Sequence, residues 1–178
     1  MEKKKSSRIQ LLLLDIVILP ILIAIDQYTK HLAVIRLKNQ PAFSIIDGVL
    51  EFNYLENKGA AFGMLQNQKI FFVFVAVILL CVIIYVLVKL PMKKKYHKLH
   101  FLLITISAGA IGNMIDRLRL DYVVDFIYIV LINFPIFNVA DMYVTIATTI
   151  LAFLVLFIYK EEDFEFLSFK QKKYREIK

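Results

Sequence analysis

Hydrophobic and polar positions separate into long blocks along this chain. Four stretches approach the roughly 20 apolar residues that a helix needs to cross the hydrocarbon core of a bilayer. They are residues 9–25, 70–88, 99–115 and 134–159, and the second contains no charged residue. This pattern predicts an all-α membrane protein with four transmembrane helices in a single integral membrane domain, residues 1–178.

The basic residues give the predicted helices a direction. Cytoplasmic loops of membrane proteins carry an excess of Lys and Arg. Of the 22 Lys and Arg residues, fifteen lie in the N-terminus, in the loop between the second and third stretches, or in the tail 160–178. We therefore expect both termini and this tail in the cytoplasm, the tail as a short interfacial or disordered segment. The remaining loops are expected on the outer side.

The first outer loop, residues 36–69, has a pattern of its own. Asp47-Gly48 lies between two β-prone runs, residues 43–46 and 49–54. An Asp-Gly pair in this position is a strong signal for a β-hairpin. We expect a small β element at the outer face, between the first two helices.

Composition agrees with a membrane protein. The chain is 60% hydrophobic, above the roughly 45–50% of soluble domains. The net charge of +7 does not indicate nucleic acid, because the basic residues form short clusters beside apolar runs rather than one amphipathic face. The N-terminus resembles a secretory signal but lacks a small-residue cleavage site after Ile25, so we expect an uncleaved span. Cys81, the single cysteine, is expected to pack inside the bundle.

Polar residues from three predicted helices and both outer loops fall at the outer end of the bundle. They are Asp26, Lys30, Asn57, Asn113, Asp116, Arg117, Asp125, Asn138 and Asp141. Ionisable groups at membrane depth are costly and by default indicate function. For the pairs Asp26–Lys30 and Asp116–Arg117, a solvated interfacial ion pair is the alternative interpretation.

Two of these carboxylates have no cation close in sequence. Asp141 lies inside an apolar helix without a cation three or four residues away, so it needs a distant partner or a proton. Asp125 lies in an apolar run beside the third helix. Two carboxylates facing each other in a low-dielectric site share a proton, so one can act as a base towards water and the other as an acid towards a carbonyl. That arrangement is typical of aspartic proteases and needs no cofactor.

Other chemistries are less well supported. There is no HExxH motif, and His97 and His100 lie beside lysines at the cytoplasmic end, where we expect a solvated loop rather than a metal site. A proton conductor is an alternative function, but it should have carboxylates along the whole membrane depth. Only Asp15 lies in the cytoplasmic half, where we expect it to reach the interface or pair locally. A non-catalytic adaptor is a third interpretation.

Five short blocks, in order, resemble the signature blocks of the lipoprotein signal peptidases, also called signal peptidase II. The blocks are Asp26-Gln27-Tyr28-Thr29-Lys30, Asn57-Lys58-Gly59-Ala60-Ala61-Phe62, Gly112-Asn113-Met114-Ile115-Asp116-Arg117, Val123-Val124-Asp125-Phe126 and Phe137-Asn138-Val139-Ala140-Asp141. The resemblance implies an aspartyl endopeptidase of the bacterial inner membrane. Such an enzyme cuts the signal peptide from prolipoproteins just before a lipobox cysteine that carries diacylglycerol.

The resemblance also implies roles for individual residues. Asp125 and Asp141 would be the catalytic dyad. The positions that shape the site or bind substrate would be Asp26, Lys30, Asn57, Gly59, Asn113, Arg117, Asn138 and Ala140. Asp116 is assigned to an ion pair with Arg117 or to the polar network of the site. Met142 stands where a small residue is expected and would narrow the pocket.

The expected partners follow from this resemblance. They are prolipoproteins with a diacylglyceryl-cysteine and the membrane lipid, with no nucleic acid and no metal or cofactor. We expect a monomer whose active site lies near the outer face, with the hairpin and the loop at Asn57 able to close over the peptide as a lid.

Overall fold

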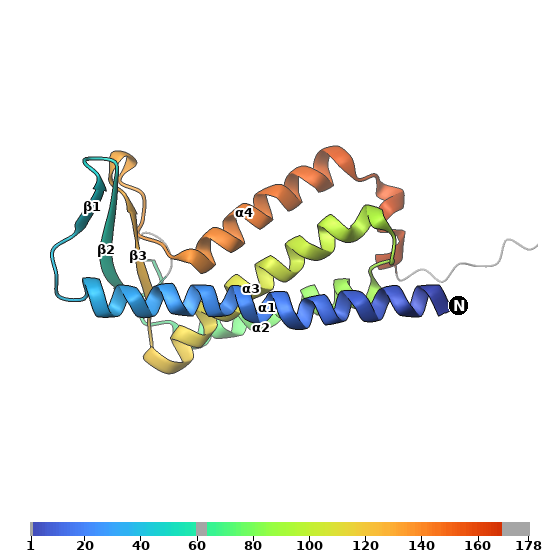
Figure 1. Cartoon of the computed structure of the whole chain (residues 1–178), viewed down its shortest axis with the longest axis horizontal. Coiled ribbons are helices and arrows are strands. Elements are labelled where there is room, and N and C mark those ends of the chain that lie inside the picture. Colours follow the sequence, from blue (N-terminus) through green and yellow to red (C-terminus); the bar gives the residue numbers. More distant parts are fainter. Residues whose placement is uncertain (1, 60–63, 169–178) are drawn as a thin grey trace, which may run out of the picture.

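The computed structural model describes residues 2–59 and 64–168, with side chains from residue 11 onward. Four long helices dominate it: α1 (Glu2–Leu37), α2 (Lys69–Lys89), α3 (His97–Leu120) and α4 (Val139–Phe153), the last extended by a π-helical turn, Leu154–Ile158. Within these described residues, four helices are long and apolar enough to cross a membrane. This confirms the predicted fold class, and Figure 1 shows the bundle with a small sheet at one end.

Two helices run past the apolar stretches that predicted them. α1 continues to Leu37 and α3 to Leu120, so their final turns carry charged residues. Three of these, Asp26, Lys30 and Asp116, are only 0–3% exposed. Buried charges are tolerated when they are paired and hydrogen-bonded, and each of these side chains has partners on another helix. The first charged residue therefore does not mark the end of either helix.

α4 begins at Val139, five residues later than the predicted stretch 134–159. Before it, Phe137 forms an antiparallel bridge with Ile127, and its carbonyl accepts the Ile127 N–H at 2.8 Å. Asn138 is the N-cap residue, with extended backbone angles. Apolar residues suit a strand and a buried helix equally well, so hydropathy alone could not separate this extended segment from the helix that follows.

The sheet has three antiparallel strands in the order β1 (Phe43–Ile46), β2 (Leu50–Asn57) and β3 (Val123–Ile129). The predicted hairpin is β1–β2, and Gly48 in its turn has a φ of +72°, which glycine adopts without steric cost. β3 was not predicted as a strand, because its partner lies about 70 residues earlier in the chain. Its pairing with β2 brings residues 123–125 opposite residues 55–57.

α3 lies at the centre of the bundle and packs against the other three helices. Most of α3 is buried, whereas most of α1, α2 and α4 is not. The close approach of α4 depends on Gly109, where an added Cβ would lie 2.5 Å from the Ala140 carbonyl oxygen. Cys81, on α2, is exposed rather than packed inside the bundle, because α2 touches its neighbours along one side only. That expectation was wrong.

The end of the bundle far from the sheet corrects two further expectations. Asp15 on α1 lies 2.8 Å from Nε2 of His100 on α3, and His100 is only 7% exposed. Asp15 therefore pairs across two helices rather than locally, and His100 lies inside the bundle rather than in a solvated loop. The tail begins with a 3₁₀ helix, Glu161–Leu167, that packs near Tyr159. Its later part, residues 169–178, lies outside the described residues.

Candidate active site

Asp125 is buried on β3, with 1% of its surface exposed. Its two carboxylate oxygens accept hydrogen bonds from the side-chain amides of Asn57 at 2.8 Å and Asn138 at 2.6 Å. Asn57 is the last residue of β2, so the pairing of β2 with β3 places this amide beside the carboxylate. Asn138 approaches from the start of α4. Asp125 is thus held by neutral donors from two other elements.

Asp141 lies in the first turn of α4 and takes part in capping that helix. The Asn138 side chain accepts the Asp141 N–H at 3.0 Å, and the Asn138 N–H donates back to the Asp141 carboxylate at 3.1 Å. This reciprocal capping box fixes both side chains at the helix N-terminus. The other Asp141 oxygen accepts from the Asn113 side chain on α3 at 2.7 Å. Asp141 is therefore held by α3 and by its own helix.

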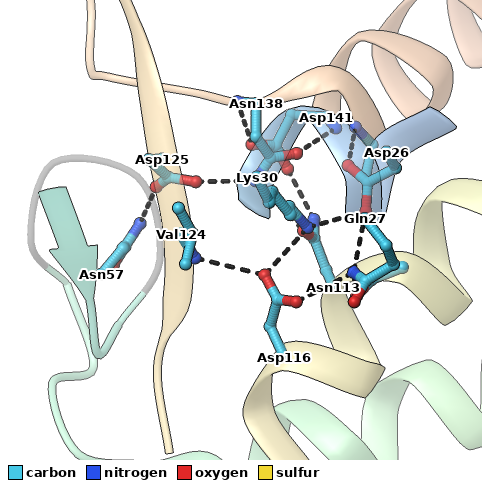
Figure 2. A network of polar contacts seen from close by, with 12 residues as sticks. Asp26, Gln27, Lys30, Asn57, Asn113, Asp116, Val124, Asp125, Asn138 and Asp141 are labelled. Carbon is cyan, nitrogen blue, oxygen red and sulfur yellow. Dashed lines mark hydrogen bonds and ion pairs between the residues drawn. The ribbon is translucent and has the colours of Figure 1, made fainter. Parts of the chain in front are cut away.

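Asn138 joins the two carboxylates. Its side-chain NH₂ donates to Asp125, while its backbone N–H donates to Asp141. The side chain is fully buried, so these bonds replace any contact with solvent. Figure 2 shows Asp125 and Asp141 on either side of Asn138. The structure thus brings together the two acids that the sequence singled out.

The surroundings of Asp125 change its acidity. Burial, with a smaller contribution from the nearby charge of Asp141, raises the pKa of Asp125 to about 7, although the amides of Asn57 and Asn138 and the charge of Lys30 act in the opposite direction. Burial disfavours the charged form of a carboxyl group, and a second carboxylate nearby has the same effect. Asp125 can therefore hold a proton near neutral pH.

A second group of charges lies behind the two carboxylates. The Lys30 ammonium contacts Asp26 at 2.9 Å and Asp116 at 3.0 Å, and it donates to the Asn113 side-chain oxygen at 2.9 Å. The predicted pairing of Asp26 with Lys30 is present, but it is buried rather than solvated. Since Asn113 also donates to Asp141, it connects this group to the candidate dyad (Figure 2).

Asp26 also fixes the start of α4. Its carboxylate accepts the backbone N–H of Ala140 at 2.9 Å, so α1 supplies a second cap for that helix. Ala140 is completely buried. Gly112 on α3 makes room for this contact, because an added Cβ there would lie 2.5 Å from the Asp26 carboxylate. The predicted residue Ala140 thus contributes through its backbone and small size.

Asp116 and Arg117 are neighbours in sequence but serve different parts of the site. Asp116 accepts from Gln27 at 2.9 Å and from the Val124 N–H at 3.2 Å, besides pairing with Lys30. It therefore belongs to the polar network, and the alternative of an ion pair with Arg117 is not formed. Arg117 instead donates to the Gly59 carbonyl at 3.1 Å and lies over the Phe72 ring at 4.6 Å.

A cavity of about 510 Å³ opens beside the two carboxylates. Its polar lining is formed by Asn57, Gly59, Asn113, Arg117, Asp125, Asp141 and Thr145, and its apolar lining by Phe72, Val123, Phe134, Pro135, Ile136, Phe137, Met142 and Ile146. Among the side chains that the structure describes, in residues 11–59 and 64–168, no three His, Cys, Asp or Glu are placed to hold a metal ion. The cavity suits a largely apolar ligand that meets two carboxylates.

Comparison with known proteins identifies the family. A family model described as signal peptidase (SPase) II matches residues 18–157. The chain belongs to the signal peptidase II family. Proteins named lipoprotein signal peptidase are similar to it: that of Caldanaerobacter subterraneus subsp. tengcongensis is 43% identical over 143 residues, covering 80% of this chain and 95% of that protein. That of Streptococcus thermophilus is 43% identical over 142 residues, covering 80% and 90%.

Two solved structures described as bacterial membrane enzymes share the fold of this signal peptidase II family member. One superposes with a TM-score of 0.69 at 28% identity and covers 89% of this chain and 94% of its own. The other has a TM-score of 0.69 at 30% identity, with 82% and 94% covered. The resemblance inferred from five sequence blocks is therefore confirmed.

The signal peptidase II blocks did not reveal every contact in the site. Gln27, the Val124 N–H and the Phe72 ring were not predicted, although each contacts a predicted residue. Gln27 lies within the first block, but besides its neighbour Asp26 it donates to Gly112 and Asp116 on α3, and Phe72 lies in a uniformly apolar helix. No local spacing rule reports such contacts between distant elements.

Proposed function

We propose that this chain is an intramembrane aspartyl endopeptidase. It cuts the signal peptide from diacylglyceryl-modified prolipoproteins just before the lipobox cysteine. The single observation that carries the proposal is the meeting of Asp125 and Asp141 at one cavity, bridged by Asn138. Membership of a peptidase family agrees with it, and the substrate class follows from relatives named lipoprotein signal peptidase.

The chemistry is hydrolysis by a carboxyl pair that holds one proton. One carboxylate takes a proton from water, whose oxygen attacks the scissile carbonyl carbon, while the other carboxyl gives its proton to the carbonyl oxygen. When the tetrahedral intermediate collapses, the C–N bond breaks and the amine leaves with a proton from the first carboxyl. The second carboxyl recovers a proton from the intermediate. One water is consumed, and both carboxyls return to their starting state.

The surroundings of the dyad fit a lipid-modified peptide. The cavity is bounded by apolar side chains from α2, α4 and the segment before α4, including Phe72, Phe134 and Ile146. An apolar lining with a few convergent polar groups is typical of binding sites for apolar ligands. A signal peptide and a diacylglyceryl tail are both dissolved in lipid, so a dyad at membrane depth can meet the scissile bond there.

The Lys and Arg bias supports an orientation in the bacterial inner membrane. It favours cytoplasmic termini, so the sheet end of the bundle and the dyad lie near the outer face. The sheet and the loop at Asn57 are proposed to close over the peptide, since Arg117 already holds the Gly59 carbonyl at the cavity. Cross-linking from residues 43–54 to a bound lipopeptide tests this closure, and the absence of such cross-links contradicts it. We propose that the enzyme acts as a monomer.

Cleavage of a diacylglyceryl-modified prolipoprotein by the purified chain tests this function. Wild type should release the signal peptide, while Asp125→Asn and Asp141→Asn should each lose most of the activity. Asp121→Asn is the matched control, because Asp121 has a largely exposed side chain paired with Lys69 and does not line the cavity. Full activity in either dyad variant contradicts the catalytic assignment. No cleavage by folded wild type would return the proton conductor and the adaptor to consideration.

A further inference from the structure

The two carboxylates of the proposed dyad differ in their surroundings. Asp125 lies on a strand and accepts only from the neutral side-chain amides of Asn57 and Asn138. Asp141 lies in the first turn of α4, where the partial positive charge of a helix N-terminus favours an anion. It also accepts a backbone N–H of that turn, from Asn138. The helix thus stabilises charge on Asp141 and does not do so on Asp125.

A buried cation reinforces this difference through one intermediate residue. Lys30 donates to the Asn113 side-chain oxygen at 2.9 Å, and the Asn113 NH₂ donates to Asp141 at 2.7 Å. The orientation of the Asn113 amide is fixed, because the same oxygen also accepts from Asn138 at 3.1 Å. The NH₂ group must therefore face Asp141 as a donor. An amide whose oxygen accepts from an ammonium is polarised and becomes a stronger donor.

Resting on the proposed function, we propose that Lys30 is a positioning residue that acts through Asn113 to keep Asp141 ionised. The dyad is then asymmetric: Asp141 is the base and Asp125 is the acid. Asp141 takes the proton of the attacking water, and Asp125 gives its proton to the carbonyl oxygen. As the C–N bond breaks, Asp141 passes its new proton to the leaving amine and Asp125 regains one from the intermediate, which restores both groups.

Other charges also act on Asp141 and set the sign of each test. Those around it are Asp26 and Lys30 on α1, Asp116 and Arg117 on α3, and Asp125 on β3. The charge of Lys30 favours the ionised forms of both Asp141 and Asp125, but only Asp141 is also linked to Lys30 through Asn113. Asp116, on the far side of Lys30, opposes the ionised form of Asp141. Neutralising Lys30 and neutralising Asp116 should therefore shift the ionisation of Asp141 in opposite directions.

The pH dependence of kcat/KM, measured on a diacylglyceryl-modified prolipoprotein, tests the inference. In Lys30→Met, the acid limb of the pH profile, where kcat/KM falls at low pH, should shift to higher pH by about one pH unit, since a unit charge is lost near the base. In Asp116→Asn it should move down by a similar amount. At acidic pH, Lys30→Met should lose about 10-fold in kcat with KM little changed. Lys38→Met is the matched control, because Lys38 pairs with Glu56 in a largely exposed position away from the cavity.

Opposite displacements of the acid limb support the inference, because general damage to packing would not change sign between two variants of one cluster. An unmoved limb in both variants, or displacement in the same direction, would overturn it. If Lys30→Met fails to fold, Asp116→Asn decides alone, and a limb that stays or moves up contradicts the inference. If the wild type cleaves the substrate but the acid limbs of the two variants do not move, only the proposed role of Lys30 is contradicted. Wild type that does not cleave removes the proposed function as well.

Discussion

At the scale of single residues, Asn138 contacts both acids of the site and also caps the helix that carries one of them. It caps α4, orients Asp141 through the backbone and donates to Asp125, and it does so without any exposed surface. An Asn at an N-cap is common for local reasons. Here the same side chain also spans from a helix to a strand. A helix-capping signal and a bridge between the two proposed catalytic acids therefore coincide in one residue.

Asn138→Ala should harm stability and activity together. Loss of the N-cap should lower the free energy of unfolding by about 1 kcal/mol. Loss of the contact with Asp125 should lower kcat/KM by about 100-fold, because small misplacements of reacting groups have large effects. Thermal unfolding in detergent and the cleavage assay measure the two effects. Asn53→Ala, on β2 and outside the cavity, should change neither strongly, and equal losses in both variants would contradict the account.

The raised pKa of Asp125 predicts an alkaline limit to activity. If Asp125 must hold a proton to act as the acid, kcat/KM should fall as the pH rises through about 7. Stability should follow the same sign: between the unfolded value of about 3.9 and about 7, the folded protein binds more protons than the unfolded chain. The free energy of unfolding should therefore decrease as the pH rises through that window. Activity that stays flat to about pH 9 would contradict this assignment.

At the scale of elements, the position of the site depends on how the first turn of α4 packs against α1 and α3. The Ala140 N–H meets Asp26 from α1, and the Ala140 carbonyl lies over Gly109 of α3. The first turn of α4 is thus held by two other helices as well as by its own cap. This placement fixes the position of Asp141.

Gly109→Ala should displace that turn. The added methyl group would meet the Ala140 carbonyl oxygen at 2.5 Å and Val144 at 2.7 Å, and the backbone contact cannot be relieved by a rotamer change. Overpacking of this kind typically costs about 1–3 kcal/mol. We expect a lower unfolding temperature and a loss of activity, measured in parallel. Leu118→Ala, at an exposed position of the same helix, is the control, and an active, fully stable Gly109→Ala would contradict the placement.

Much of the element map follows from the sequence, and the exceptions share one cause. Hydropathy marks four helices, and Asp47-Gly48 marks the hairpin, because both signals are local. β3 depends on β2, about 70 residues earlier in the chain, and the later start of α4 depends on the pairing of Phe137 with Ile127, which hydropathy does not report. The pair formed by Asp15 and the buried His100 was missed because its members lie 85 residues apart. Local sequence patterns indicate the length and polarity of an element but do not indicate which other residues it contacts.

At the scale of the whole molecule, polar chemistry is concentrated at the sheet end of a largely apolar bundle. Figure 1 shows the sheet there and the N-terminus at the opposite end. The acids could be grouped from the sequence because the alternation of spans assigns each loop to a side. Their exact partners could not, since three helices and two strands contribute to one network.

The orientation can be measured directly with cysteine labels. In a Cys81→Ser background, we expect a membrane-impermeant maleimide to label Asp47→Cys but not Lys94→Cys in spheroplasts. Both positions are exposed, in the hairpin turn and in the loop before α3 respectively. Labelling of both positions after permeabilisation controls for reactivity. Labelling of Lys94→Cys alone in intact spheroplasts would reverse the proposed topology.

We propose that Asp125 and Asp141 act as one catalytic unit. Measuring kcat/KM of the double variant Asp125→Asn/Asp141→Asn beside the two single variants tests this most directly. Groups that act as a unit show strongly non-additive losses. Each single variant should lose about 100-fold or more, and the double variant should lose little beyond that. If the loss in the double variant equals the product of the two single losses, or if either single variant keeps substantial activity, the dyad is contradicted.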